Sequence, residues 1–413
     1  MKENRYKAQI QKLLELFNEL FPFNSPLDQA LSQLYRSNKS YGSKDRKFIS
    51  GSLFGFARWY GWLNEIDADT SKKLLLGYLL DSNEITPLTV FWAESLELNL
   101  EFLKACECPD QFSLDKKLAL IQTLNPKLEL KHLNPEFTPE QPKEYFEFAQ
   151  MRAPLWLRCR EDKMGKIVTE FQTKDIPFKK HESFPNTLEV LTTPNLPSLE
   201  GFKKGYFQVQ DISSQMVGYI MPMEPHQKWL DLCAGSGGKA LHLAEKLNGT
   251  GRVFGLDIRQ GTVNEGIKRV RKTRMRNIGL DVWDGRIFPV FDENFAGVLV
   301  DAPCSGSGTW RRAPDLRWRT SYEDVEKYQK LQGEILRKGA TLVDSKGILA
   351  YVTCSIFPQE NEGVIDSFLK DNSDYSLMPY KLPVSGEECN GSHLFTPQEL
   401  NGVGLFITLM KRK

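Results

Sequence analysis

The chain lacks the features that would place it in a membrane or in a disulfide-bonded fold. No apolar run approaches the roughly 20 residues that a transmembrane helix needs, and residues 1–10 are polar and lack the apolar centre of a secretion signal. The seven cysteines are an odd number without the spacing of a disulfide framework. These absences favour a cytoplasmic protein whose thiols are reduced.

Patterns for metal binding and an overall basic charge are also missing. The five histidines form no cluster, no His-Glu-x-x-His motif occurs, and Cys106 and Cys108 have no further Cys or His partner nearby. We therefore expect no metal. The 54 Lys and Arg residues balance 53 Asp and Glu residues, so only local clusters can indicate a nucleic-acid partner.

The amino-terminal part of the sequence has a helical pattern. Apolar residues recur at helical spacing, and we expect a helical domain over residues 1–125. Residues 126–144 are polar and contain several prolines, which predicts a linker. The core of the helical domain is expected within residues 45–63, which carry Phe48, Phe54, Phe56, Trp59 and Trp62.

Two further units follow the linker. Short β-like runs at 154–158 and 187–191 surround a helical stretch at 167–173, which predicts a small α+β unit over residues 145–205. From residue 206 to residue 413, helix-like segments separate short runs rich in Val, Leu and Ile. Buried parallel strands joined by crossover helices have this signature. The expected strands are 228–233, 252–257, 296–301 and 347–353.

A glycine-rich loop follows the first of these strands. It reads Ala234-Gly235-Ser236-Gly237-Gly238-Lys239, and an acidic residue, Asp257, ends the next strand. Glycine lets the backbone approach a ligand, the start of a helix offers free N–H groups, and a carboxylate can bind ribose hydroxyls. The pattern fits a nicotinamide dinucleotide as well as S-adenosylmethionine. It does not fit a P-loop, because alanine follows Lys239.

Two cysteines follow two other strands of the same sheet. Asp301-Ala302-Pro303-Cys304 comes after strand 296–301, and Cys354 comes after strand 347–353. Ligands of an open parallel sheet bind beyond the carboxyl ends of its strands, so both thiols are expected at the rim that holds the glycine loop. A thiolate that adds to carbon 6 of cytosine activates carbon 5 toward an electrophilic methyl group, and a carboxyl group can assist at ring nitrogen 3. Hydride transfer needs no such cysteines, which disfavours a dehydrogenase.

At these residues the sequence resembles the RsmB/NOP/Sun family of RNA cytosine-5 methyltransferases. The matching blocks are LDLCAGSGGK (230–239), GLDI (255–258), DAPCSGSGTWRRAPDLRW (301–318) and YVTCSIFPQENEGVI (351–365). The resemblance is strong from about residue 145 onward. Residues 42–59 are more faintly similar to the family's NusB-like helical extension. The resemblance to the family implies a Rossmann-like class I methyltransferase domain over 206–413, together with an α+β RNA-binding unit and an amino-terminal NusB-like domain.

The resemblance also implies roles for individual residues. Asp257 would bind the ribose of S-adenosylmethionine, Asp284 would lie near its adenine, and Asp301 would contact the cofactor and the target cytosine. The position of Cys354 is the family's nucleophile, and that of Cys304 is thought to assist release; DNA enzymes attack from a Pro-Cys dipeptide instead, which would point to Cys304. The remaining residues expected to line the cofactor are Cys233, Ala234, Gly235, Ser236, Gly237, Gly238 and Lys239.

One departure from the family pattern lies in the cofactor loop. Gly235-Ser236 stands where the family usually has Ala-Pro, which predicts a looser turn and leaves cofactor affinity open.

Basic and aromatic residues after Cys304 are the best candidates for RNA contact. Cations interleaved with stacking rings grip unpaired RNA, and the target base must leave its stack to reach the thiol. The basic run 268–276 is a weaker candidate, because such runs often form solvated faces. The residues that we expect to bind RNA are Arg311, Arg312, Arg317 and Trp318.

Together these patterns predict an S-adenosylmethionine-dependent RNA cytosine-5 methyltransferase that is monomeric. Small-subunit ribosomal RNA is the expected substrate, because the NusB-like extension accompanies such enzymes in the family. Transfer RNA is the main rival substrate. A non-catalytic RNA-binding assembly factor is the rival of another class, although binding alone would need neither Asp301 nor the two cysteines.

Overall fold

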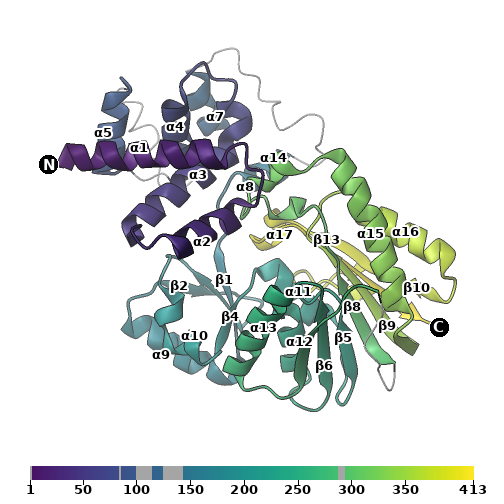
Figure 1. Cartoon of the computed structure of the whole chain (residues 1–413). Coiled ribbons are helices and arrows are strands. Elements are labelled where there is room, and N and C mark those ends of the chain that lie inside the picture. Colours follow the sequence, from purple (N-terminus) through teal and green to yellow (C-terminus); the bar gives the residue numbers. More distant parts are fainter. Residues whose placement is uncertain (1, 83–84, 99–113, 124–142, 287–293) are drawn as a thin grey trace. The chain divides into compact units, whose positions relative to one another are not determined.

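The structure is a computed structural model that describes residues 2–82, 85–98, 114–123, 143–286 and 294–413. The chain forms two compact units (Figure 1). The helical unit comprises Met1–Arg152 and Thr309–Tyr322, and the α/β unit comprises Ala153–Gly308 and Glu323–Lys413. Within the described residues, no helix combines the length and apolar character needed to cross a membrane.

The helical unit is built around two helices whose backbones pass close to each other. A Cβ atom on Gly55 of α3 (Ser43–Leu63) would lie 2.5 Å from the carbonyl oxygen of Gly77 of α4 (Thr70–Ser82). Trp59 and Trp62 of α3 are fully buried, so the expected aromatic core is confirmed. The other helices of this unit are α1 (Lys2–Leu20), α2 (Leu27–Ser37), α5 (Pro87–Ser95), α7 (Leu114–Gln122), α8 (Lys143–Ala149) and α14 (Leu316–Arg319).

The segment Thr309–Tyr322 belongs to the helical unit although it follows the Cys304 loop in sequence. Its Asp315 accepts a hydrogen bond of 3.1 Å from the backbone N–H of Leu27, and the indole N–H of Trp318 donates to the carbonyl of Ala57 at 2.5 Å. The prediction of an uninterrupted catalytic domain over 206–413 therefore differs from the structure. Local sequence patterns do not show to which core a short segment packs.

A small antiparallel sheet opens the α/β unit, in the order β2-β3-β1-β4. β1 (Leu155–Cys159), β3 (Thr187–Val190) and the helix α9 (Met164–Thr173) match the expected elements. β2 (Phe178–Lys180) and β4 (Phe207–Val209) complete the sheet, with Leu157 opposite Val209. The small sheet thus extends past the predicted boundary at 205, and α8 lies with the helical unit. Most of the predicted linker, residues 126–142, lies outside the described residues.

The larger sheet has the order β10-β14-β9-β8-β5-β6-β7, with β13 paired to β14. Its central strands are parallel: β5 (Lys228–Asp231), β6 (Arg252–Asp257), β7 (Ile278–Val282), β8 (Phe295–Asp301) and β9 (Val343–Thr353). The chain winds outward in opposite directions from the β5–β8 pair, and a ligand crevice is expected at this switch point. Antiparallel strands close one edge: β10 (Tyr375–Leu377), β13 (Ser392–Phe395) and β14 (Leu405–Arg412).

Alternating residues of the central strands bury against helices on opposite faces. Trp229 joins the core formed with α11 (Ile212–Ile220) and α12 (Gly238–Lys246), whereas Leu230 joins the core formed with α15 (Tyr322–Ala340) and α16 (Glu362–Asp371). Leu299 and Val300 divide in the same way. This alternation is the two-sided burial of a doubly wound sheet. It confirms the predicted Rossmann-like fold.

Candidate active site

The glycine loop leaves β5 and turns into α12 through two left-handed residues. Gly235 has φ +54 and Gly237 has φ +77, a conformation that glycine adopts at little cost. A Cβ atom on Gly235 would meet no atom nearer than Nη2 of Arg259, at 3.7 Å. The space above the loop is therefore open at Gly235, as a cradle for a small ligand requires.

Asp257, at the end of β6, holds this loop from the neighbouring strand. Its Oδ2 accepts a hydrogen bond of 2.9 Å from the backbone N–H of Gly235, and Arg259 donates to both oxygens at 3.0 and 3.1 Å. Burial would raise the pKa of Asp257, but the Arg259 hydrogen bonds outweigh it and lower this pKa. The side chain of Arg259 is 66% exposed, so ribose hydroxyls could replace it on the ionised carboxylate.

Three ionisable side chains lie near the glycine loop and interact with one another. Nζ of Lys239, in the first turn of α12, is 2.6 Å from Oδ2 of Asp301. Burial alone would lower the pKa of Lys239. The Asp301 carboxylate, and to a smaller extent Cys354, outweigh burial, so the pKa of Lys239 is raised. Asp231 is fully buried at the end of β5, and burial, then the charge of Asp301, raises its pKa to about 8. Asp231 was not predicted as a site residue, although it ends β5 three residues before the glycine loop.

The structure brings the two predicted cysteines together. Sγ of Cys304, after β8, lies 3.2 Å from Sγ of Cys354, after β9, and both side chains are half-buried. The hydrogen bond to Cys354, and then burial, raise the pKa of Cys304 well above its usual value. Cys304 therefore keeps its proton at neutral pH, and it can share this proton with the neighbouring sulfur.

The predicted RNA contacts fall into a different environment from the one expected. Arg311 and Arg317 are buried, with 3% and 5% of their surfaces exposed. Arg311 donates to the carbonyls of Met151 and Arg152, and Arg317 lies over the rings of Trp62, Trp310 and Trp318.

Burial in the helical unit gives Arg311 and Arg317 packing contacts, and a direct RNA contact at either residue stays a prediction. Their sequence context did not distinguish packing from binding. Trp318 is half-buried, and Arg312 is exposed. Asp284 is exposed beyond β7, where its carboxylate accepts a hydrogen bond from the N–H of Arg286. For Arg312, Trp318 and Asp284, ligand contact stays a prediction.

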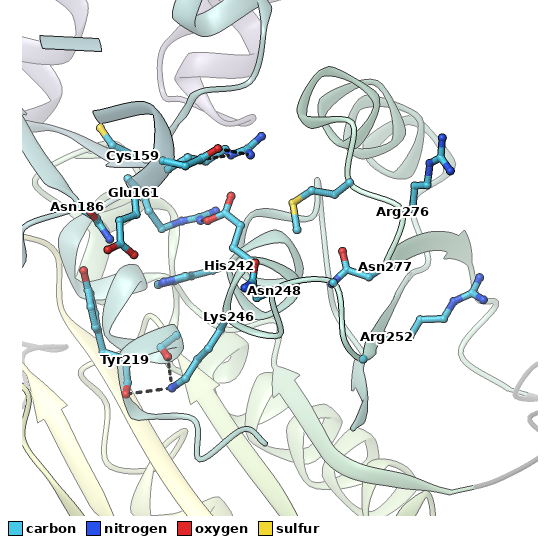
Figure 2. Close-up of a pocket in the computed structure, with 18 residues that line it drawn as sticks. Cys159, Glu161, Asn186, Tyr219, His242, Lys246, Asn248, Arg252, Arg276 and Asn277 are labelled. Carbon is cyan, nitrogen blue, oxygen red and sulfur yellow. Dashed lines mark hydrogen bonds and ion pairs between the residues drawn. The ribbon is translucent and has the colours of Figure 1, made fainter. Parts of the chain in front are cut away.

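A cavity of about 1190 Å³ lies at the other edge of the sheet. It opens beside Arg252, where β6 begins, and Asn277, just before β7 (Figure 2). The thiols of Cys304 and Cys354, in contrast, follow the ends of β8 and β9. Arg158 in its wall is paired with Glu245, and Lys246 donates to the carbonyls of Gly218 and Met221. These groups satisfy one another, so we do not place the active site in this cavity.

Comparison with known proteins matches the part of the chain that carries this site. Residues 218–411 match the family model described as 16S rRNA methyltransferase RsmB/F. The ribosomal RNA small subunit methyltransferase B of Klebsiella pneumoniae (strain 342) is 32% identical over 296 residues, which are 70% of this chain and 67% of that protein. The protein of the same name from Proteus mirabilis is 30% identical over 67% of this chain and 63% of its own length. The chain thus matches about two thirds of the length of these relatives.

Solved structures share the fold. The protein PH0851 covers 100% of this chain with a TM-score of 0.73 and 20% identity, and 99% of that protein is covered. A methyltransferase homologue from Pyrococcus horikoshii covers 65% of this chain with a TM-score of 0.56 and 25% identity, and 90% of that protein is covered. The matched residues 218–411 include the glycine loop and both cysteine loops, and the Klebsiella protein is 32% identical with 67% of its length matched; the chain therefore belongs to the 16S rRNA methyltransferase RsmB/F family.

Proposed function

We propose that this protein transfers a methyl group from S-adenosylmethionine to carbon 5 of a cytosine in RNA. The observation that carries the proposal is the pair of thiols 3.2 Å apart, next to an ion-paired carboxylate at the switch point of the sheet. S-adenosylmethionine, the cofactor of this family, supplies the electrophilic methyl group. The open turn at Gly235 and the ionised carboxylate of Asp257 fit its amino-acid part and its ribose.

The residues of the site suit the separate steps of this reaction. A thiolate of Cys354 adds to carbon 6 of the cytosine, and ring nitrogen 3 takes up a proton from the Lys239–Asp301 pair as the ring gains negative charge. Lys239 holds Oδ2 of Asp301 and so fixes the orientation of this carboxyl group. After the methyl group has moved to carbon 5, the proton on carbon 5 passes to solvent and its electron pair restores the double bond between carbons 5 and 6. Cys354 then leaves as a thiolate, and ring nitrogen 3 gives back its proton.

The two cysteines differ in a way that favours Cys354 as the nucleophile. The raised pKa of Cys304 keeps it a thiol, whereas nucleophilic attack needs a thiolate. Cys354 and the ammonium group of Lys239 interact electrostatically, and a nearby cation stabilises a thiolate. Cys304 is then placed to assist the release step.

Small-subunit ribosomal RNA is the substrate that we favour, because the relatives from Klebsiella and Proteus are named for it. Transfer RNA is the alternative RNA. A non-catalytic assembly factor is disfavoured, because binding RNA would require neither the thiol pair nor the Lys239–Asp301 ion pair. Exposed Arg312 is the residue after Cys304 that we expect to contact the RNA backbone.

The test is transfer of labelled methyl from S-adenosylmethionine to unmodified small-subunit ribosomal RNA and, separately, to unmodified transfer RNA, followed by digestion to nucleosides. We expect labelled 5-methylcytidine from the ribosomal RNA, and none with Cys354→Ala as the matched control. Label only in transfer RNA would replace the proposed substrate. No label in either RNA, in free form or in a ribosomal particle, with cofactor binding intact, would support the assembly-factor function instead.

A further inference from the structure

A buried carboxylate lies behind the two cysteine loops. Glu360, just before α16, is 0% exposed. Its Oε1 accepts hydrogen bonds from the backbone N–H of Ser305 at 2.8 Å and from Nε2 of Gln332 at 2.9 Å. Its Oε2 accepts from the hydroxyls of Ser305 and Ser355, both at 2.5 Å. A buried carboxylate with this many donors is well satisfied and holds them in place.

The partners of Glu360 are the residues that directly follow the two thiols. Ser305 follows Cys304 and Ser355 follows Cys354, so one carboxylate links the two loops immediately after their sulfurs. The loops also meet at a second point, where the hydroxyls of Ser307 and Ser355 lie 3.1 Å apart.

The residues before the thiols are held by neighbours of Glu360. Nε2 of Gln332, which donates to Glu360, also donates to the carbonyl of Pro303 at 2.9 Å. Asn361 accepts from the hydroxyl of Thr353 at 2.6 Å and donates to the carbonyl of Ser355 at 2.9 Å. Both cysteines are therefore fixed on each side by side chains that converge on Glu360 and Asn361.

We infer that Glu360 is a positioning residue that sets the separation of the Cys304 and Cys354 thiols, an inference that rests on the proposed two-thiol reaction. While Cys354 is bonded to carbon 6 of the base, Cys304 must stay within reach of the same base for release to occur. Misplacement of a reacting group by about 1 Å can lower a rate by about a hundredfold. Release, which needs both thiols at once, depends most on Glu360.

The first test measures the thiol separation in the resting protein without RNA or cofactor. Diamide takes two electrons and two protons from two thiols, so that a disulfide forms and the azo group becomes a hydrazine. Glu360→Gln keeps the shape of the side chain but removes its charge and one acceptor. We expect the Cys304–Cys354 disulfide, identified by mass spectrometry of peptides, to form about tenfold more slowly than in the parent protein.

The matched control is Glu362→Gln, the same change at an exposed acid two residues away. It should form the disulfide at the parent rate. An unchanged or faster rate in Glu360→Gln would overturn the inference. If Glu360→Gln does not fold, Ser355→Ala removes a single donor to the carboxylate and is expected to slow the disulfide by about threefold.

The second test separates positioning from a loss of stability. With RNA and S-adenosylmethionine, Glu360→Gln should lower kcat by about tenfold with KM for RNA changed less than about threefold, and the fraction of protein covalently bound to RNA should rise. A parallel fall of kcat and of the covalent fraction would indicate a structural role only and would contradict the inference. If the parent protein methylates no RNA, the proposed function fails, whereas the disulfide rates still report whether Glu360 sets the thiol separation.

Discussion

Carboxyl groups that lie at neighbouring strand ends of this protein have opposite protonation preferences. Asp257 is ionised because Arg259 and the N–H of Gly235 hydrogen-bond to it, which outweighs its burial. Asp231 is fully buried beside Asp301 and holds its proton up to about pH 8. Environment, rather than residue type, therefore makes one of them an ionised hydrogen-bond acceptor and the other a neutral carboxyl group.

The role of Asp257 can be tested by cofactor binding. Asp257→Ala should weaken the binding of S-adenosylmethionine by about 10- to 100-fold, because hydrogen bonds to a charged group contribute about 1.5–3 kcal/mol. Isothermal titration calorimetry measures this directly. Arg259→Ala is the control. Its affinity for S-adenosylmethionine should stay within about threefold of that of the parent protein, because Arg259 only hydrogen-bonds to the Asp257 carboxylate from its exposed side. Equal losses in both variants would contradict a ribose contact at Asp257.

The raised pKa of Asp231 predicts a pH-dependent stability. The unfolded chain releases this proton near the ordinary value of 3.8, whereas the folded protein keeps it up to about 8. The unfolded state thus binds fewer protons between these values, and the Asp231 contribution to stability falls as the pH rises from about 4 to about 8.

Asp231→Asn imitates the protonated acid and removes this contribution. The melting temperature of the variant minus that of the parent protein should therefore be higher at pH 8 than at pH 5, by about 3 °C. Thermal unfolding followed by circular dichroism at both pH values is the measurement. A difference between variant and parent that does not change with pH would show that Asp231 is ionised in the folded protein.

At the scale of elements, the parallel strands could be predicted from sequence because they are buried on both faces. The expected strand 252–257 coincides with β6, and the other three expected strands overlap β5, β8 and β9. The antiparallel strands β10, β13 and β14 were not predicted, because their pairing depends on contacts distant in the chain. Once the parallel strands are predicted, the residues that follow their carboxyl ends can be predicted to lie at one rim of the sheet.

Glu360 could not be predicted in this way. It lies in the quoted block 351–365, but nothing local in the sequence shows that a glutamate there is buried against two serines from different loops. Its role follows only from the packing of α15 and of the two cysteine loops around it.

Gly308, in the loop after Cys304, lies close to the backbone of Gly404 and of Cys354, which makes it sensitive to substitution. A Cβ atom at Gly308 would lie 2.3 Å from the carbonyl oxygen of Gly404 and 2.9 Å from that of Cys354. Gly308→Ala should therefore force the Cys354 loop apart and lower the melting temperature by about 4 °C or more. Gly261→Ala in α13 (Gln260–Thr273) is the control, because its Cβ meets no atom within 4 Å; it should be neutral or stabilising. Similar melting temperatures for the two variants would contradict the close crossing.

At the scale of the whole molecule, the segment Thr309–Tyr322 is the unexpected feature. It starts five residues after Cys304, yet it completes the core of the helical unit with Trp310, Arg317 and Trp318. The sequence of this segment predicts an RNA-binding surface, because basic residues and aromatic rings alternate in it. The same alternation also builds a buried cation–π cluster, and sequence alone does not distinguish the two.

This difference predicts opposite outcomes for two neighbouring arginines. Arg317→Ala should lower the stability by about 2 kcal/mol or more, because it leaves a cavity among three indole rings. Arg312→Ala, at an exposed position, should change it by less than about 0.5 kcal/mol. In RNA binding, measured at a temperature where both variants are folded, we expect Arg312→Ala to weaken the affinity and Arg317→Ala to leave it unchanged. The reverse pattern would support Arg317, rather than Arg312, as an RNA contact.

The central claim is that two thiols divide the reaction between attack and release, and one gel experiment tests it most directly. Each cysteine variant is incubated with S-adenosylmethionine and the RNA substrate and then run on a denaturing gel. Cys304→Ala should accumulate methylated RNA bound covalently to the protein, because Cys354 still attacks but release is impaired. Cys354→Ala should give neither this slow band nor methyl transfer. A slow band with Cys354→Ala and none with Cys304→Ala would contradict the account and reverse the two roles.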